Sequence, residues 1–198
     1  PGKGSYGYSP YTPDLRVENG KVVGKSEIRL NTQWYGRGKE NALQKQLDYD
    51  VSTKWHPANS NKVEGTPAHE LMHDMMKWLA IQEFNADIAR KAFPADMLKS
   101  LADTESRTFI RNTDGSRRFA SELEVKIQDQ RMAMEGSIVD NALRRMGYDN
   151  PTAQIRNKEI EKYSRYARTK KKQSQIIAEA ITEGFEDYIF NGNNAQEL

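Results

Sequence analysis

The sequence predicts an α+β fold, in which a small β-region comes first and helices make up most of the rest. Within residues 15–36, short apolar runs lie on either side of a turn dipeptide, as is typical of strands. From residue 65 onward, apolar residues recur at three- and four-residue intervals, which is typical of amphipathic helices. No internal repeat is visible.

The strands are predicted near the N-terminus. Residues 1–15 are rich in glycine, proline, serine and tyrosine, which indicates an irregular arm. Asn19-Gly20 is a hairpin-turn signal between apolar runs, and Glu27 to Leu30 continues in a strand-like pattern. A short helix is expected at residues 39–49 and an extended segment at residues 51–62.

Helices follow, separated by proline and glycine. One long helix, or two, begins where Gly65, Thr66 and Pro67 supply a break, a cap and a first-turn proline. This helical stretch ends before Pro94, where another helix begins. The later helices are predicted at residues 117–147, with an interruption near Gly136, at residues 151–163 and at residues 174–190.

The length and composition suit one domain with a modest core. The chain has 198 residues, of which 36% are hydrophobic and 29% are charged, so much of the helix surface must be solvated. We therefore expect an irregular arm at residues 1–15, followed by a single domain at residues 16–198. That domain would carry a helical insertion at about residues 94–160.

The absence of cysteine restricts the possible metal chemistry. With no cysteine in the chain, disulfides and thiolate metal sites are excluded. A metal site would have to use histidine, aspartate, glutamate or water. The chain has three histidines, so their positions are informative: His56, His69 and His73.

The charge balance does not predict a nucleic-acid partner. Thirty basic residues nearly match 28 acidic ones, and a dedicated nucleic-acid-binding protein usually has a concentrated basic face. The densest basic run, residues 170–172, is expected to be solvated. No apolar stretch approaches the roughly 20 residues that cross a bilayer, and no signal peptide is visible, so no membrane partner is predicted.

Residues 69–73, His-Glu-Leu-Met-His, have the pattern H-E-x-x-H within the predicted long helix. Residues four apart on a helix share a face, so the imidazoles of His69 and His73 can bind one zinc ion. The carboxylate of Glu70 can then take and return the protons of a zinc-activated water. This arrangement predicts peptide-bond hydrolysis with Glu70 as the general base.

A catalytic zinc site uses three protein ligands and leaves one position open. A third histidine shortly after the motif is excluded, because Met76 and Leu79 stand where that subclass has glycine and histidine. The other source of a ligand is a glutamate from a later helix. In the last predicted helix, Glu179 and Glu183 lie four residues apart and share a face. Glu179 is therefore the predicted third ligand, and Glu183 is the alternative.

The late run from Glu179 to Gly192 has the pattern E-x-x-x-E-x-F-x-D-Y-x-x-N-G. Together with H-E-L-x-H, it resembles the zincin-type domain of some bacteriophage minor head or head-morphogenesis proteins. It is also similar to the catalytic domain of anthrax lethal factor. Residues 47–73, which include His56-Pro57, resemble the approach to the motif in the phage group.

The resemblance implies a zincin-like fold, with a small N-terminal sheet, an active-site helix and a late helix that carries a ligand. It implies one Zn2+ per chain, bound by His69, His73 and Glu179, with Glu183 as an orienting partner. The family often places a tyrosine hydroxyl near the metal. Tyr166, in the matching segment S-R-Y-A, would donate a hydrogen bond to the oxyanion of the tetrahedral intermediate.

The leading hypothesis is a zinc metalloendopeptidase that acts on extended polypeptide, as a domain of a phage or prophage structural protein. It would be located in the virion or the host cytoplasm, and its partners would be its substrate and other virion proteins. Glu27 to Trp34 is a candidate edge strand for pairing with substrate. Two alternatives stay open: a non-catalytic virion structural or interaction domain that keeps the zincin fold, and a protease toxin domain directed at one host target.

The residues predicted to pack in the core beneath the zinc helix are Met72, Met75, Met76 and Trp78.

Overall fold

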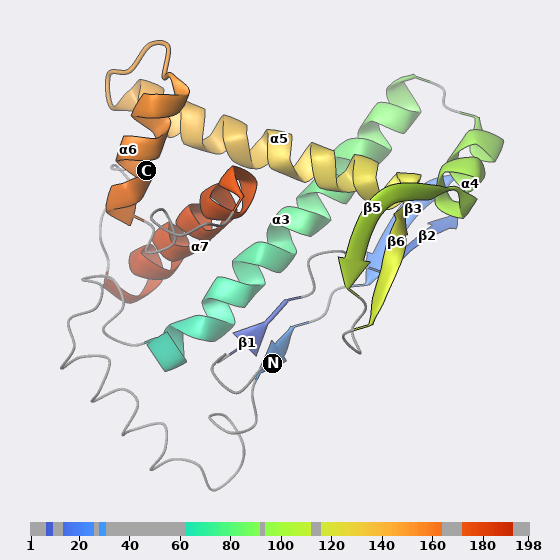
Figure 1. The fold of residues 1–198 in the computed structure, drawn as a ribbon, viewed down its shortest axis with the longest axis horizontal. Coiled ribbons are helices and arrows are strands. Elements are labelled where there is room, and N and C mark those ends of the chain that lie inside the picture. The colour runs from blue at the N-terminus through green and yellow to red at the C-terminus, as the bar shows by residue number, and fades with distance from the viewer. Residues whose placement is uncertain are drawn as a thin grey trace, which may run out of the picture. The chain divides into compact units, whose positions relative to one another are not determined.

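The computed structural model describes residues 7–9, 14–25, 28–30, 62–91, 94–111, 116–163 and 172–191 (Figure 1). Within these ranges the chain forms five helices and three two-stranded antiparallel sheets, so the α+β prediction is confirmed at this level. None of these described helices is long and apolar enough to cross a membrane. The helix expected at residues 39–49 and nearly all of the extended segment expected at 51–62 lie outside the described residues.

Short strands occur at the start of the chain and again in its middle. The strands are β1 (Gly7–Tyr8), β2 (Asp14–Glu18), β3 (Lys21–Lys25), β4 (Arg29–Leu30), β5 (Glu105–Arg111) and β6 (Arg117–Ser121). The sheets pair β1 with β4, β2 with β3, and β5 with β6. The helices are α3 (Lys62–Arg90), α4 (Ala95–Asp103), α5 (Glu122–Arg145), α6 (Ala153–Tyr163) and α7 (Gln173–Asn191).

The chain divides into two compact units. Unit 1 consists of Pro1–Ser9, Ile28–His73 and Glu135–Leu198, and unit 2 consists of Pro10–Glu27 and Asp74–Met134. Helices α3 and α5 each supply residues to both units. The expected insertion at about residues 94–160 therefore also contributes to both units, and the single-domain interpretation stays a prediction.

The predicted hairpin at Asn19-Gly20 is present in unit 2. β2 and β3 pair antiparallel on either side of it, from Asp14 opposite Lys25 to Glu18 opposite Lys21. Asn19 and Gly20 have φ values of 50° and 71°, and positive φ at both central residues matches the right-handed twist of the flanking strands. The segment expected to be an irregular arm contains β1 and the beginning of β2, because strand pairing outweighs its glycine-rich composition.

Asn85 of α3 fixes the β2–β3 hairpin to the core of unit 2. Its Oδ1 accepts a hydrogen bond from the Val22 backbone N–H at 2.8 Å, and its Nδ2 donates to the Val22 carbonyl at 2.8 Å. The amide thus pairs with β3 as another strand would. This anchoring places hairpin side chains against buried residues of α3, α4 and α5. The buried members of this cluster are Val22, Ala80, Ile81, Ile88, Leu98, Leu123 and Ile127.

The helix predicted from residue 117 begins later, because residues 117–121 form β6. Ser121 and Glu124 form a capping box: the Ser121 N–H donates to Glu124 Oε2 at 2.7 Å, and the Glu124 N–H donates to Ser121 Oγ at 3.2 Å. Arg118 also pairs with the Glu124 carboxylate, with Nη1 2.7 Å from Oε2. Because of these contacts, β6 ends and α5 begins at adjacent residues. The predicted interruption near Gly136 is wrong, since α5 continues to Arg145.

α3 begins earlier than predicted. It starts at Lys62, so Thr66 is not its cap and Pro67 lies inside the helix. Pro67 removes one backbone hydrogen bond, a loss that the many bonds of the following turns outweigh. Of the predicted core residues, Met76 is buried, whereas Met75 and Trp78 are exposed. With 3.6 residues per turn, these two positions lie on other faces of the helix than Met76.

The middle of helix α7 is buried in unit 1. Ile176 and Ala180, one turn apart, pack with Ile160 of α6 in a second buried cluster. Arg156 of α6 donates to Asp140 of α5 through Nε at 2.9 Å and Nη2 at 2.7 Å. From residue 180 to residue 184 every position of α7 is buried. A helix this enclosed has one fixed rotation about its axis, which determines where its polar side chains point.

We predict that Asn85→Leu lowers the free energy of unfolding by about 1–3 kcal/mol, because both backbone groups of the buried Val22 lose their partner. Gln82→Leu, at an exposed position of the same helix, serves as the control and should change it by no more than about 0.5 kcal/mol. Urea unfolding followed by circular dichroism measures both. Equal effects of the two substitutions would show that the amide does not anchor the hairpin.

Candidate metal centre

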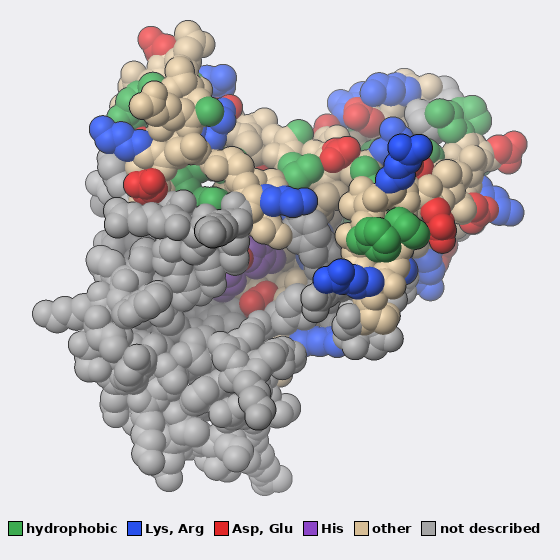
Figure 2. All heavy atoms as spheres, in the orientation of Figure 1, with side chains coloured by type: hydrophobic (Ala, Val, Ile, Leu, Met, Phe, Trp, Pro, Cys, Tyr) green, Lys and Arg blue, Asp and Glu red, His purple; other side chains and the backbone are tan. Residues whose placement is uncertain are grey.

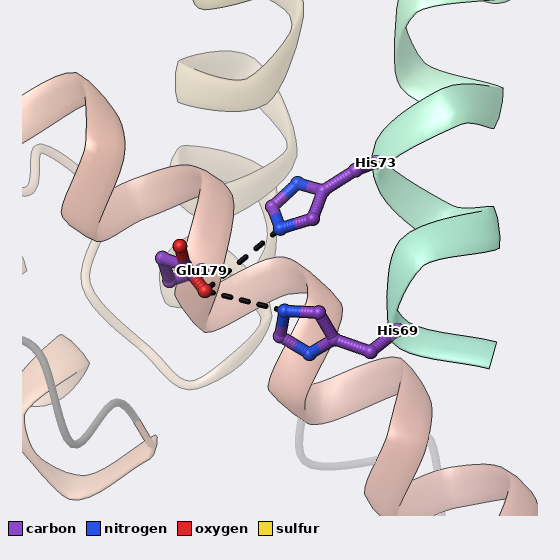
Figure 3. Close-up of side chains that lie close together, drawn as sticks. All are labelled: His69, His73 and Glu179. Atoms are coloured by element: carbon purple, nitrogen blue, oxygen red, sulfur yellow. Dashed lines mark ion pairs between the residues drawn. The ribbon is translucent and has the colours of Figure 1, made fainter. Parts of the chain in front are cut away.

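Two histidines of α3 and one glutamate of α7 face one another within unit 1 (Figure 3). His69 and His73 project from the same side of α3, because they are about one turn apart. Their ring centroids are 4.9 Å apart and their planes are inclined by 78°. Glu179 extends from α7 toward both rings. The structure thus brings together the three residues that the sequence predicts as ligands.

The converging atoms are the Nε2 atoms of the two histidines and one carboxylate oxygen. Glu179 Oε2 lies 3.3 Å from His69 Nε2 and 3.8 Å from His73 Nε2. The three ligand atoms all lie within 4.8 Å of one another. Two atoms bound about 2.1 Å from one tetrahedral ion would lie about 3.4 Å apart. The spacing suits a single ion between the three side chains, so this group could hold a metal ion.

The group is mostly withdrawn from solvent. The exposed fractions of the side chains are 12% for His69, 19% for His73 and 18% for Glu179. Burial by itself would raise the pKa of Glu179, but hydrogen bonds from His69 and His73, together with their charge, outweigh it. The pKa of this carboxyl is therefore held well below its usual range. The ionised carboxylate is the form that binds a cation.

Thr182, which is not among the predicted site residues, also lies beside the candidate metal group. Its Oγ1 donates a hydrogen bond to the Glu179 carbonyl at 2.9 Å and lies 3.4 Å from His69 Nε2. The side chain is buried, with 1% of the residue exposed. Its spacing of three residues from Glu179 was the available signal, since residues i and i+3 are neighbours on a helix. The hydroxyl therefore adds a fourth polar group beside the nitrogen of a candidate ligand.

The other predicted site residues lie elsewhere in the structure or outside the described residues. Glu70 follows His69 on α3 and is partly buried. Glu183 is almost fully buried one turn after Glu179, and it is not a member of the candidate metal group. Tyr166 and His56 lie outside the described residues. Of the two glutamates considered as the third ligand, Glu179 is the one that belongs to the group that could hold a metal ion.

Comparison of the chain with protein-family models, with curated proteins and with solved structures finds no match. The chemistry open to the group follows from its own donor atoms, two imidazole nitrogens and one carboxylate oxygen. These donors suit a divalent transition metal better than Ca2+ or Mg2+, which prefer oxygen ligands. Figure 2 shows histidine side chains (purple) visible from one face, consistent with their partial exposure.

Loss of a residue that only orients a metal ligand weakens metal binding by about 10- to 100-fold. We predict that His73→Ala and Glu179→Ala each weaken zinc binding by more than this. Each substitution removes one of three converging donors. Glu161→Ala, at an exposed glutamate of α6, is the matched control and should bind like the unmodified chain. Competition with a fluorescent chelator gives the affinities. Unchanged zinc binding after Glu179→Ala would exclude it as a ligand.

We predict that Thr182→Val weakens zinc binding by about 10-fold, whereas Thr182→Ser retains it within about 3-fold. Valine keeps the volume of the side chain but loses the bond to the Glu179 carbonyl and the oxygen beside His69. Serine keeps both. The same chelator competition distinguishes them, and equal affinities for the two variants would assign the hydroxyl to packing alone.

Proposed function

We propose that this chain is a zinc-dependent metallopeptidase domain with a zincin-like fold. The observation that carries the proposal is the convergence of His69, His73 and Glu179 around one candidate ion site. The H-E-x-x-H pattern on a continuous helix supports it, because Glu70 then accompanies the two histidines. The described helices and small sheets are compatible with that fold without identifying it.

Zinc is the metal that we propose for the site. Two imidazoles and one carboxylate form a ligand set used by catalytic zinc sites, and three protein ligands leave a fourth position for water or substrate. When bound, the ion supplies Lewis-acid chemistry, because it polarises a carbonyl group and makes water more acidic. The ionised Glu179 contributes the negative charge that holds a divalent cation in a mostly buried site.

Glu70 is the proposed general base. It takes a proton from the attacking water and delivers it to the amine that leaves when the peptide bond breaks. Glu70 directly follows His69, so it lies on the same part of α3 as the two histidines. Its carboxylate is not a member of the candidate metal group. Tyr166 is proposed to donate a hydrogen bond to the developing oxyanion, which stabilises the transition state.

Glu183 is proposed to orient the ligands rather than to bind the metal. Its buried position one turn after Glu179 supports this role, because carboxylates near a metal centre commonly fix the direction of ligand side chains. The parent polypeptide is proposed to be a phage or prophage structural protein, active in the virion or the host cytoplasm on an extended polypeptide. This part of the proposal is supported by the resemblance of the residues around His69 and Glu179.

A second candidate function is a structural metal site in a virion or interaction domain without turnover. The position of Thr182 favours it, because its buried hydroxyl oxygen lies 3.4 Å from His69 Nε2 and adds a protein oxygen beside a candidate ligand. A structural site has all four positions filled by protein, whereas a catalytic site keeps one open. Metal-dependent cleavage of peptides separates the two functions.

We predict that Glu70→Gln lowers peptide cleavage by about 10²- to 10⁴-fold and leaves zinc content unchanged, because the amide cannot take up the proton. Zinc-loaded protein is assayed with a library of internally quenched peptides, and zinc is measured by elemental analysis. Glu161→Gln is the control for loss of a negative charge elsewhere. Undiminished cleavage by Glu70→Gln would refute the mechanism. Full zinc occupancy without cleavage in the unmodified chain would favour the structural site.

A further inference from the structure

The β5–β6 hairpin of unit 2 exposes two stacked aromatic rings. Phe109 and Phe119 lie directly opposite each other in the strand register, with ring centroids 4.1 Å apart and planes inclined by 31°. The two residues are 63% and 39% exposed, respectively. Because the two rings are exposed side by side rather than singly, the pair is a candidate contact surface.

Exposed arginines lie on both strands of the hairpin. Arg117 is two residues from Phe119 on β6, and positions two apart in a strand share a face. Arg107 is also exposed on β5. Figure 2 shows hydrophobic (green) and basic (blue) side chains side by side where Figure 1 labels β5 and β6.

The arginines of the hairpin have two different roles. Arg118 is engaged with the Glu124 carboxylate at the start of α5, and this contact fixes the hairpin to the helix. Among the described residues, by contrast, neither Arg107 nor Arg117 forms an ion pair with a carboxylate. Their charge is available to a ligand. The hairpin therefore offers positive charge and flat apolar rings on one anchored element.

We propose that the surface formed by Phe109, Arg117 and Phe119, with the exposed Arg107 on the same strand as Phe109, binds single-stranded nucleic acid, a function separate from the candidate metal centre. Bases would stack on the exposed phenylalanine rings, and the arginines would contact phosphates. A nucleic-acid strand supplies a flat group and a negative charge in every repeating unit. An acidic polypeptide would need aromatic and acidic residues in a matching alternation, so the nucleic acid is the simpler fit to both features.

The overall amino-acid composition did not indicate this surface. Basic and acidic residues nearly cancel over the whole chain, which led to the expectation of no nucleic-acid partner. The strands β5 and β6 together carry four arginines and one glutamate, Glu105. The charge is local, and Arg107 and Arg117 are exposed on the two strands that carry the aromatic rings.

The test is fluorescence anisotropy of the full chain with labelled oligothymidylate and oligouridylate of about 16 nucleotides, at about 50 to 200 mM salt. Phe109→Leu should weaken binding by about 5- to 100-fold without changing the slope against log salt, because only stacking is lost. Arg117→Gln should weaken binding and reduce that slope by roughly 0.7, the value for one phosphate contact on a single strand. Lys158→Gln, at an exposed lysine of α6, should bind like the unmodified chain.

Circular dichroism checks that each variant is folded. If Phe109→Leu is not folded, Phe109→Trp replaces it, and its larger ring should bind at least as tightly as phenylalanine. No binding by the unmodified chain at the lowest salt would overturn the proposal. So would an equal loss in Arg117→Gln and Lys158→Gln, which would indicate non-specific attraction. Tighter binding of a Glu–Tyr copolymer than of either oligonucleotide would assign the surface to acidic polypeptide instead.

Discussion

A negative charge removed from water has to be compensated, and in unit 1 the compensation for Glu179 comes from the two histidines of α3. These contacts depend on the positions of two helices. The histidines lie one turn apart on one face of α3, and α7 presents its carboxylate at their level. The apolar packing of Ile176 and Ala180 against α6 fixes the rotation of α7, and with it the direction of Glu179. The chemistry of the centre therefore depends on side chains that do not touch it.

Much of the site could be predicted because it depends on helix geometry. The spacing of His69 and His73 places them on one face wherever the helix lies, so the sequence was sufficient for that pair. It favoured Glu179 as the third ligand and left Glu183 as the alternative, since both occupy nearly the same face of α7. The rotation of α7 decides, and long-range packing sets that rotation. Thr182 was missed for the same reason, because a threonine in a helix is ordinarily a packing residue until its neighbours across the helices are known.

The errors in the fold have local physical causes. The alternation of polar and apolar residues at 117–121 is too short to distinguish a strand from the start of a helix. The capping box at Ser121 and Glu124 is the signal that marks the boundary. The start of α3 was misplaced because a threonine followed by proline usually begins a helix, whereas here the helix already includes Pro67. Two-stranded sheets are marginal by themselves, so their stability depends on anchors such as Asn85, which no periodic pattern reveals.

The distances along the chain between contacting residues also bear on when the centre can form. Ser121 and Glu124 are three residues apart, Val22 and Asn85 are 63 apart, and His69 and Thr182 are 113 apart. Closing a longer segment costs more conformational entropy, so the helix cap and the hairpins can form before the centre does. During synthesis from the N-terminus, both histidines leave the ribosome long before α7 exists. A translation product that stops before Gln173 therefore carries H-E-x-x-H intact and still lacks the glutamate of the candidate metal group.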